Sequence, residues 1–369
     1  MDVTLVVTHD CNLGCDYCFA GEKRRAPMSD AVADAALDLA LGDGSEGDGA
    51  TQISFFGGEP LIEWRRIVRT VARARARAER IGRAISFTIT TNGTLLDEDK
   101  ARFLVDAGFF VGLSIDGVRA AHEATRPTRG GRSSFDDATR ALDLLVAHGA
   151  DFETITVVDP RNVAHIGASV RWLVERGATR LTLNPHFGAD WSDGALAVWE
   201  AGYREAADLY VERCREGRPV HLNFVENKLR AHAKGGYGAG DRCSVGHRSV
   251  AVAPSGNLYP CERFVAEDRD TTMAIGHVAS GIDLGRRMCL DAQRGPVADE
   301  CGGCGEQSRC NSFCACANYA ETGSISTPGG VQCWHERMAM RLADDVGRRL
   351  WAARDRHFLA RVYSYEGAA

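Results

Sequence analysis

Three cysteines near the N-terminus, Cys11, Cys15 and Cys18, follow the spacing Cys-x3-Cys-x2-Cys. Cysteine thiolates bind zinc and hold iron–sulfur clusters, and a closed structural site of either kind uses four protein ligands. A centre with only three protein ligands keeps one metal position open to a substrate or cofactor. The triplet therefore predicts a metal centre that does chemistry and is not purely structural.

A second group of seven cysteines lies in the C-terminal part of the chain. Its members are Cys243, Cys261, Cys301, Cys304, Cys310, Cys314 and Cys333. A zinc ribbon, in which paired cysteines hold one ion, is the structural alternative. However, seven cysteines do not make one four-cysteine site, and the unequal spacings lack the symmetry of paired knuckles. Of the other cysteines, we expect Cys214 and Cys289 to be ordinary thiols.

The composition excludes several classes of protein. The chain has 369 residues and a net charge of −6, so there is no electrostatic case for binding nucleic acid or an anionic membrane. No apolar stretch is long enough to cross a membrane, and the N-terminus lacks the basic segment of a signal peptide. We therefore expect a cytoplasmic protein. In a reducing compartment, thirteen cysteines indicate metal or redox use and not disulfides.

Short apolar runs alternate with longer amphipathic stretches in the first half of the chain. The expected strands are Val3–Val7, Gln52–Phe56, Ile85–Thr91, Phe110–Ile115, Phe152–Val158 and Arg180–Asn184. The expected helices are Ser29–Leu41, Trp64–Arg80, Asp97–Ala107, Ser133–His148, Val163–Arg176 and Gly194–Arg215. This alternation is typical of parallel βα units, and six units predict an α/β fold with a partial (β/α)6 TIM-type barrel. Reactive residues of such barrels lie in the loops that follow the strands, where the triplet also lies.

We expect three segments along the chain. They are a barrel at 1–234, a cysteine-rich domain at 235–335 that metal holds together in place of a large apolar core, and a helical tail at 336–369. A basic amphipathic helix, His335–Arg361, is expected to pack on the barrel with its charges in solvent. Gly42–Gly49 alternates glycine with acidic residues but lacks the ligand spacing of a calcium loop, so we interpret it as a polar connection.

Three more strand ends carry residues that could contact a cofactor. Gly57-Gly58-Glu59-Pro60 follows the second strand, where paired glycines let a backbone approach a ligand and a Glu or carbonyl can accept from an ammonium group. Asn92 follows the third strand, and Ser114 and Asp116 lie at the end of the fourth. The alternative is that all are turn and cap residues. Both interpretations stay open for Asn92, whereas we favour ligand contact for Ser114 and Asp116.

In order and spacing, these segments resemble the radical S-adenosylmethionine (SAM) enzymes over the first half of the chain. In that family three cysteines hold a [4Fe-4S] cluster, and the amino and carboxylate groups of SAM bind the fourth iron. The resemblance implies such a cluster at the N-terminal triplet. It also implies SAM contacts from Tyr17, Gly57, Gly58, Glu59, Pro60, Asn92, Ser114, Asp116, Arg126 and Asn184. Arg126 could clamp a carboxylate with two hydrogen bonds, although most loop arginines are surface residues.

The seven later cysteines resemble the SPASM domain of peptide- and protein-modifying radical SAM enzymes, which holds two auxiliary [4Fe-4S] clusters. Carried over by position, auxiliary cluster I would bind Cys243, Cys261 and Cys314. Auxiliary cluster II would bind Cys301, Cys304, Cys310 and Cys333. Some members have an eighth cysteine before the first of the seven, but residues 235–240 contain none. Cluster I therefore has either an open iron or another ligand, for which Cys316 is the nearest candidate. The expected cofactors are three [4Fe-4S] clusters and SAM.

Glu262 directly follows Cys261 and is the candidate catalytic residue. In the sulfatase-maturing enzymes that the chain resembles, an Asp at this position takes the substrate proton. Glu keeps the carboxylate but is one methylene longer, which changes the atom it can reach. The structural alternative is that Glu262 only pairs with Arg263 or another cation.

The resemblance implies an enzyme that uses a 5′-deoxyadenosyl radical to abstract hydrogen from a peptide. The main hypothesis is a maturase that installs a carbon–carbon, ether or thioether crosslink in a ribosomally made precursor peptide. The alternative is sulfatase-maturase-like oxidation of a protein Ser or Cys to formylglycine. Glu in place of Asp favours the crosslink, whereas the short segment before Cys11 leaves no room for a leader-binding domain.

The expected partners are a precursor peptide, a low-potential electron donor of the flavodoxin or ferredoxin type, and a separate leader-binding protein. Two weaker hypotheses are an electron-transfer or scaffold protein and a radical SAM enzyme that acts on a small molecule. The first of these needs no SAM pocket, so the Gly57–Pro60 segment argues against it.

Overall fold

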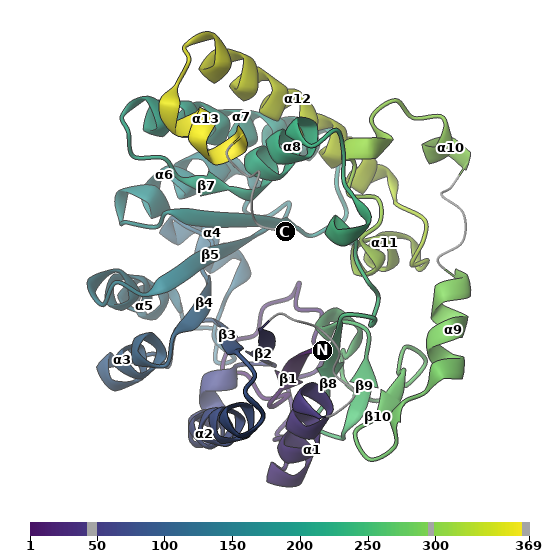
Figure 1. The fold of residues 1–369 in the computed structure, drawn as a ribbon. Helices are drawn as coiled ribbons and strands as arrows, with labels where there is room; N and C mark the ends of the chain where they lie inside the picture. The colour runs from purple at the N-terminus through teal and green to yellow at the C-terminus, as the bar shows by residue number, and fades with distance from the viewer. Residues whose placement is uncertain (43–49, 294–298, 364–369) are drawn as a thin grey trace. The chain divides into compact units, whose positions relative to one another are not determined.

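The computed structural model describes residues 1–42, 50–293 and 299–363, which fold into two compact units (Figure 1). The first unit comprises Met1–Ser114, Arg126–Phe152 and Ser244–Arg294. The second comprises Ile115–Thr125, Glu153–Cys243 and Gly295–Ala369. This division does not test the segment boundaries expected at 234 and 335, which stay a prediction. Apart from Gly42, the loop considered for calcium lies outside the described residues.

The first unit is built on a sheet with the strand order β11-β10-β9-β8-β1-β2-β3-β4. Its strands are β1 (Asp2–Val6), β2 (Thr51–Phe56), β3 (Ile85–Thr91), β4 (Phe109–Ser114), β8 (Ser249–Val252), β9 (Asn257–Tyr259), β10 (Gly276–His277) and β11 (Gly281–Ile282). β1 to β4 pair in parallel as predicted, because helical crossovers join them. β8 pairs in parallel with β1, and β9 to β11 continue the sheet as antiparallel strands.

Amphipathic helices accompany these strands, and Figure 1 shows α1, α2 and α3 on the outside of the sheet. The helical segments are α1 (Asp30–Leu41), η1 (Pro60–Glu63), α2 (Trp64–Ile81), α3 (Glu98–Asp106), α5 (Phe135–Ala147), η4 (Glu262–Phe264) and α9 (Leu284–Gln293). The side chains of Ser29 and Asp97 cap α1 and α3 by accepting backbone N–H groups. Rings of Phe55, Phe87 and Phe109 from adjacent strands contact one another in the core.

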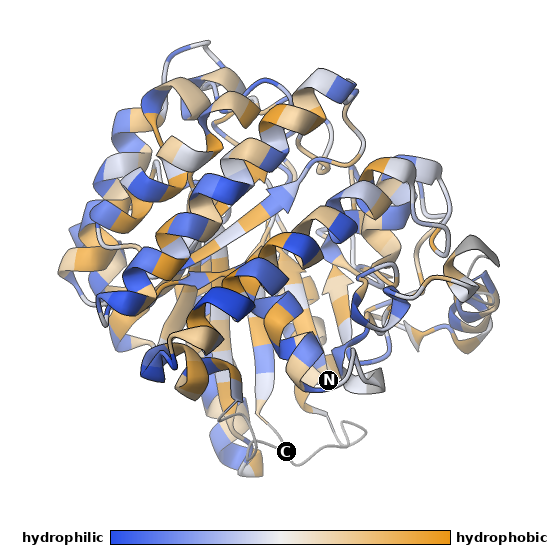
Figure 2. Cartoon of the chain, turned by 90° about the horizontal axis from the view of Figure 1, so that it is seen from above, coloured by the Kyte–Doolittle hydropathy of each residue, from blue (hydrophilic) through white to orange (hydrophobic). Residues whose placement is uncertain are grey.

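The second unit contains the parallel strands β5 (Asp151–Val158), β6 (Arg180–Pro185) and β7 (His221–Leu222). Its helical segments are α4 (Arg119–Thr125), η2 (Val163–His165), α6 (Ile166–Glu175), α7 (Asp193–Arg215), α8 (Asn223–Ala233), η3 (Ala239–Asp241), α10 (Asp299–Gly302), η5 (Gln307–Arg309), α11 (Ala315–Thr322), α12 (Gly330–Ala352) and α13 (Arg356–Tyr363). In Figure 2 the helices alternate hydrophobic and hydrophilic residues, as expected when one face is buried. Trp199, Tyr203 and Tyr210 of α7 are fully buried.

The C-terminal tail differs from the expected single helix. It forms two helices, α12 and α13, and α12 begins before His335 and contains Cys333. The break comes where Arg354 has a φ of 49° and the Asp355 side chain accepts the backbone N–H of Phe358. Its charges are also not all in solvent, because Arg361 pairs with buried Glu226. The helical periodicity of the sequence does not resolve a break of three residues.

The sequence analysis missed α4, α8 to α11 and the strands β7 to β11. Strands of two to four residues are too short to show an alternating pattern. β8 owes its place to pairing with β1, which lies more than 240 residues earlier in the chain, and no local signal reports such a contact. Within the described ranges, every helix is too short or too polar to span a lipid bilayer.

Glu226 of α8 provides a test of the second unit's stability. Its side chain is fully buried and contacts His221, Arg230 and Arg361. Although burial raises the pKa of Glu226, these cations lower it overall, so its ionised form stabilises the fold. The stabilisation is complete above the unfolded pKa of about 4.3 and is lost as pH falls through the lower folded pKa.

We expect Glu226→Gln to destabilise the protein by roughly 3 kcal/mol at pH 7, because it leaves the half-buried Arg230 and Arg361 without their anion. Thermal melting measured at pH 7, 5 and 3 should show the difference from wild type shrinking only below about pH 4. Glu212→Gln on α7, a half-exposed carboxylate, is the control. A melting difference that is unchanged at pH 3 would contradict this account.

Candidate active site

The cysteine triplet lies in a loop that backbone hydrogen bonds hold on both sides. It follows β1, and Gly14 N donates to Pro127 O at 2.8 Å. Arg129 N donates to Asn12 O at 3.0 Å. Residues 127–129 thereby hold the triplet loop in place, within the first unit.

The Gly57-Gly58 pair lies against the segment that leads from β1 into this loop. Gly58 N donates to Thr8 O at 2.9 Å, and Glu59 N donates to Asp10 O at 2.8 Å. A Cβ on Gly58 would lie 2.1 Å from Asp10 O, and one on Gly57, which has a φ of 147°, would lie 2.4 Å from Thr8 O. The two glycines therefore allow two chain segments to approach each other closely. The sequence analysis expected them to allow the backbone to approach a ligand.

The Glu59 carboxylate is fully buried and points into the protein. Oε1 accepts from Thr91 Oγ1 at 2.6 Å and from Leu61 N at 3.0 Å, and Oε2 accepts from Asn92 N at 2.7 Å. Burial raises the pKa of Glu59 to about 7, although these hydrogen bonds oppose the rise. Both oxygens thus join β2 to the end of β3, so a SAM contact from this segment would have to come from backbone carbonyls.

Asn92 contacts the triplet itself. Its Nδ2 donates to Asn12 Oδ1 at 3.0 Å and lies 3.8 Å from the Cys11 sulfur. Its Oδ1 accepts from the backbone and hydroxyl of Thr94. Asn92 thus helps to position the cysteine loop, and its contact with SAM stays a prediction.

Two other predicted SAM contacts come together in the first unit. The guanidinium of Arg126 lies 5.5 Å from the centre of the Tyr17 ring. Tyr17 lies between Cys15 and Cys18 in the sequence. Arg126 is buried, so it is not one of the surface arginines that were the alternative. Pro60 begins η1 and is also buried. A buried guanidinium beside the triplet loop is suited to bind a carboxylate.

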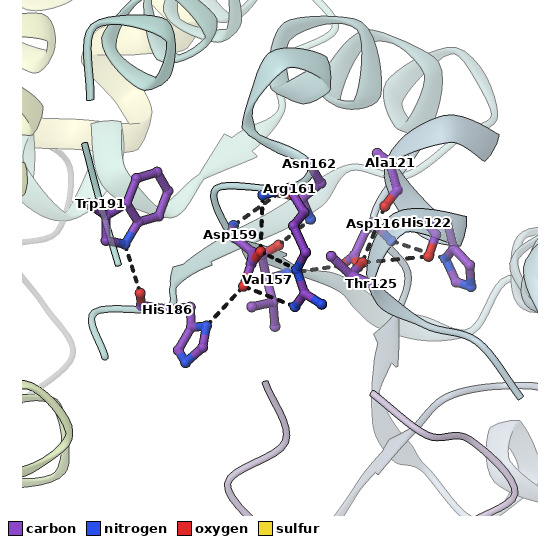
Figure 3. Close-up of polar contacts among 10 residues, drawn as sticks. All are labelled: Asp116, Ala121, His122, Thr125, Val157, Asp159, Arg161, Asn162, His186 and Trp191. Carbon is purple, nitrogen blue, oxygen red and sulfur yellow. Dashed lines mark hydrogen bonds and ion pairs between the residues drawn. The ribbon is translucent and has the colours of Figure 1, made fainter. Parts of the chain in front are cut away.

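The remaining predicted contacts are arranged differently. Ser114 ends β4 in the first unit, whereas Asp116 and Asn184 belong to the second. Asp116 is fully buried, with Oδ1 accepting from Val157 N at 3.0 Å and Oδ2 accepting from Thr125 Oγ1 at 2.7 Å (Figure 3). Both oxygens hold the loop after β4 against β5, as in the turn and cap role that was the alternative, and the ribose contact stays a prediction. Asn184 is half-buried at the end of β6.

The donor set of the triplet fits an iron–sulfur cluster. All thirteen cysteines are free, so no disulfide competes for these sulfurs. Among the described residues, no three Cys, His, Asp or Glu side chains converge as they would on one ion. In a cluster, by contrast, each thiolate binds a different iron. Burial raises the pKa of the Cys11 thiol to about 12, so its thiolate requires a cationic partner such as iron.

Two residues that the sequence analysis did not assign also belong to this loop region. Lys23 Nζ donates to the Cys18 sulfur at 2.8 Å. His9 is buried, and neither ring nitrogen has a hydrogen-bond partner among the described residues. Buried polar atoms without partners are rare in folded proteins, and a bound group would satisfy them. In the sequence, only the closeness of Lys23 and His9 to the triplet could have indicated that they belong to the site.

Glu262 lies in a segment that packs beside the triplet loop. The Arg263 guanidinium lies 5.1 Å from the ring centre of Phe19, which directly follows Cys18. Further along the segment, the Glu267 side chain accepts a hydrogen bond from Glu22 N. The Glu267 carbonyl accepts one from the Arg24 guanidinium. The Glu262 carboxylate contacts the Cys261 sulfur at 3.4 Å. The contacts of this segment therefore bring the candidate base to the region of the triplet.

The other predicted cluster ligands are divided between the units. Cys261 belongs to the first unit, and Cys243, Cys314 and the predicted ligands of auxiliary cluster II belong to the second. The sulfurs of Cys314 and Cys316 lie 3.6 Å apart, which supports Cys316 as the candidate eighth ligand. Cys214 is buried and Cys289 is exposed on α9. The ligand sets themselves stay predictions.

A buried ion pair fixes the loop that carries Cys310. Lys228 of α8 pairs with Glu336 of α12, and both side chains are less than a tenth exposed. Lys228 Nζ donates to Arg309 O at 3.0 Å, and Glu336 accepts from Asn311 N at 2.5 Å. The residues on both sides of Cys310 are thus held by two helices, one of which carries Cys333. This network pre-organises two of the four predicted ligands of auxiliary cluster II.

We expect Gly58→Ala to displace the triplet loop, because the Asp10 carbonyl is backbone and cannot rotate away. The cost should be about 3 kcal/mol, with a loss of iron at the N-terminal site. Iron content after anaerobic reconstitution and the melting temperature measure both effects. Gly130→Ala, where the new Cβ meets open space, should leave them unchanged. Wild-type iron content in the Gly58 variant would refute the role of this contact.

We expect Lys228→Met to leave the buried Glu336 without a cation, at a cost of roughly 3–5 kcal/mol. Iron content and electron paramagnetic resonance should then show loss of a C-terminal cluster while the N-terminal cluster persists. Adding Glu336→Gln should restore part of the loss. Lys234→Met, in an exposed pair with Asp241, is the control. An unaltered melting temperature and cluster content would contradict the proposed pre-organisation.

Comparison with known proteins agrees with this arrangement. Residues 5–173 match the model of the Radical SAM superfamily. The serine-type anaerobic sulfatase-maturating enzyme of Klebsiella aerogenes is 29% identical over 322 residues, which cover 82% of this chain and 76% of that enzyme. The cysteine-type enzyme of Clostridium perfringens (strain 13 / Type A) is 26% identical over 275 residues, covering 70% of this chain and 72% of that enzyme.

Solved structures share the fold. Native anSMEcpe with bound AdoMet superposes with a TM-score of 0.79 at 20% identity, covering 94% of this chain and 100% of that chain. Streptococcus suis SuiB bound to precursor peptide SuiA gives a TM-score of 0.61 at 15% identity, covering 90% of this chain and 75% of that chain. The mixed α/β fold with a parallel sheet is therefore confirmed. Residues 5–173, which carry the triplet loop, therefore form a Radical SAM domain, and the chain is homologous to the anaerobic sulfatase-maturating enzymes over most of its length.

Proposed function

We propose that the protein oxidises a Ser or Cys side chain of a peptide or protein substrate to the aldehyde formylglycine. The observation that carries the proposal is the packing of the segment around Glu262 beside the triplet loop, through contacts of Arg263 and Glu267, which supports a role for Glu262 in the reaction. The curated relatives support the same function, since serine-type and cysteine-type sulfatase-maturating enzymes each match at least 70% of this chain.

Different residues of the first unit would bind the cluster and SAM. Cys11, Cys15 and Cys18 would hold the cluster, with Lys23 and Asn92 donating to two of the sulfurs. Arg126 beside Tyr17 would bind the carboxylate of SAM. When bound, these cofactors supply two things: a radical that removes a hydrogen atom from the substrate carbon, and an acceptor for one electron.

Glu262 is the proposed base that accepts the proton of the substrate hydroxyl or thiol. Oxidation of a CH2–OH or CH2–SH group removes two hydrogens, as one hydrogen atom, one proton and one electron. A carboxylate next to the radical site can accept the proton from the hydroxyl or thiol.

Peptide crosslinking, the main hypothesis from the sequence, is now the second candidate. The relatives favour the alternative, and the one residue that favoured crosslinking is Glu262, which is longer than the Asp it replaces. Both hypotheses require a peptide substrate and a low-potential electron donor. A separate leader-binding protein is required only for crosslinking.

Product analysis with two peptides of the sulfatase type, Cys-x-Pro-x-Arg and Ser-x-Pro-x-Arg, tests the proposal. The reconstituted protein should hold on the order of twelve irons if all three clusters form. With SAM and a reductant, we expect the Ser peptide to lose two hydrogens and to react with a hydrazide, as an aldehyde does. A crosslinked product would show the same mass loss without the hydrazide reaction.

Variants assign the roles in this reaction. Cys11→Ala should form no 5′-deoxyadenosine. Glu262→Gln should keep hydrogen abstraction and lower aldehyde formation by about 100-fold, the usual contribution of a general base, whereas Glu262→Asp should keep most of it. Undiminished aldehyde formation by Glu262→Gln would remove Glu262 from the mechanism.

A further inference from the structure

A lysine side chain contacts one sulfur of the N-terminal cysteine triplet. Lys23 comes five residues after Cys18, and its Nζ donates to the Cys18 sulfur at 2.8 Å. Both residues belong to the first unit and lie in the loop between β1 and α1. The proposed function uses this contact but gives no reason for a cation at this sulfur.

No carboxylate competes with the sulfur for this cation. Within the described part of the chain, Lys23 forms no ion pair with an acidic side chain. Two acidic residues of the same region, Glu22 and Glu267, pair instead with Arg269, at 2.8 Å and 3.0 Å. The charge of Lys23 therefore acts on the sulfur and is not cancelled by a neighbouring anion.

The backbone on both sides of Lys23 is held by one residue of a distant segment. Glu267 Oε1 accepts from Glu22 N at 2.9 Å, and Glu267 O accepts from Arg24 Nη2 at 2.8 Å. The chain turns back directly after the triplet, where Gly21 N donates to the carbonyl of its last cysteine at 3.2 Å. These contacts hold the loop where the lysine side chain reaches the sulfur.

A cation at a ligand sulfur acts on the charge of the cluster that the sulfur holds. A [4Fe-4S] cluster gains one negative charge when it accepts one electron, and its reduction potential depends on nearby charge and on hydrogen bonds to its sulfurs. An ammonium group attracts the more negative, reduced form more strongly than the oxidised form. Because Lys23 is partly buried, water and salt screen this attraction less than at the surface.

We infer that Lys23 raises the reduction potential of the cluster held by the N-terminal triplet. The step concerned is transfer of one electron to the cluster from a low-potential donor, with no bond made or broken. A weaker reductant then suffices to start the reaction. Lys23 contacts a ligand of the cluster and not the substrate, so it is a positioning residue. The inference depends on the Radical SAM domain and not on which side chain is oxidised.

A redox titration of the reconstituted full chain tests the inference. Dithionite supplies the electrons, and electron paramagnetic resonance follows the N-terminal cluster, whose signal should change when SAM is added and be missing in Cys11→Ala. With Lys23→Met we expect wild-type iron content and an equilibrium constant for reduction lowered about tenfold, which is a midpoint potential about 59 mV more negative. Lys23→Arg keeps a cation and should stay within about twofold of wild type.

Arg25→Met is the matched control, because it removes the same charge from an exposed side chain of the same loop. Its midpoint potential should equal that of wild type. The inference is wrong if Lys23→Met has the wild-type potential, or if Arg25→Met shifts the potential as much, since net charge and not the contact would then be responsible. It is also wrong if Lys23→Met and Lys23→Gln both lose iron from this cluster, since the lysine would then serve to hold the cluster. None of these measurements uses a peptide, so a failure of the proposed function would not alter their outcome.

Discussion

Two backbone hydrogen bonds, from Gly58 N to Thr8 O and from Glu59 N to Asp10 O, fix the chain that enters the cysteine loop. They form only because residues 57 and 58 have no Cβ in the space that the opposing backbone occupies. From this contact the Glu59 carboxylate extends the connection to Thr91 and Asn92, and Asn92 reaches the Cys11 sulfur. The ends of β1, β2 and β3 are thereby joined into one support for the site.

Burial gives that support an unusual electrostatic character. The pKa of Cys11 rises to about 12 and that of Glu59 to about 7, so both acids disfavour their charged forms in this environment. Lys23, Arg24 and Arg126 belong to the same unit, and Lys23 contacts Cys18 directly. A cluster bound by thiolates would place its iron where the protein has desolvated one sulfur and supplied a cation to another. The site is thus prepared for a metal group before one binds.

Periodicity and spacing predicted the six parallel strands and their crossover helices, because each has several turns or alternations of buried residues. The same information located the cysteine triplet. It failed where a residue's partner lies far away in sequence. Glu59 and Asp116 were expected to contact a ligand, whereas in the structure their carboxylate oxygens accept hydrogen bonds from other residues of the protein. Asp159 and His186 lie 27 residues apart and form a pair only because β5 and β6 are adjacent strands.

β1 is the innermost support of the cysteine loop, and its neighbours in the sheet are β2 and β8. During translation, β2 leaves the ribosome soon after β1, whereas β8 is made only when two thirds of the chain has been synthesised. Until then one edge of β1 has unsatisfied backbone donors and acceptors, and closing so long a loop is slow. The strand that carries the triplet therefore completes its sheet late in synthesis.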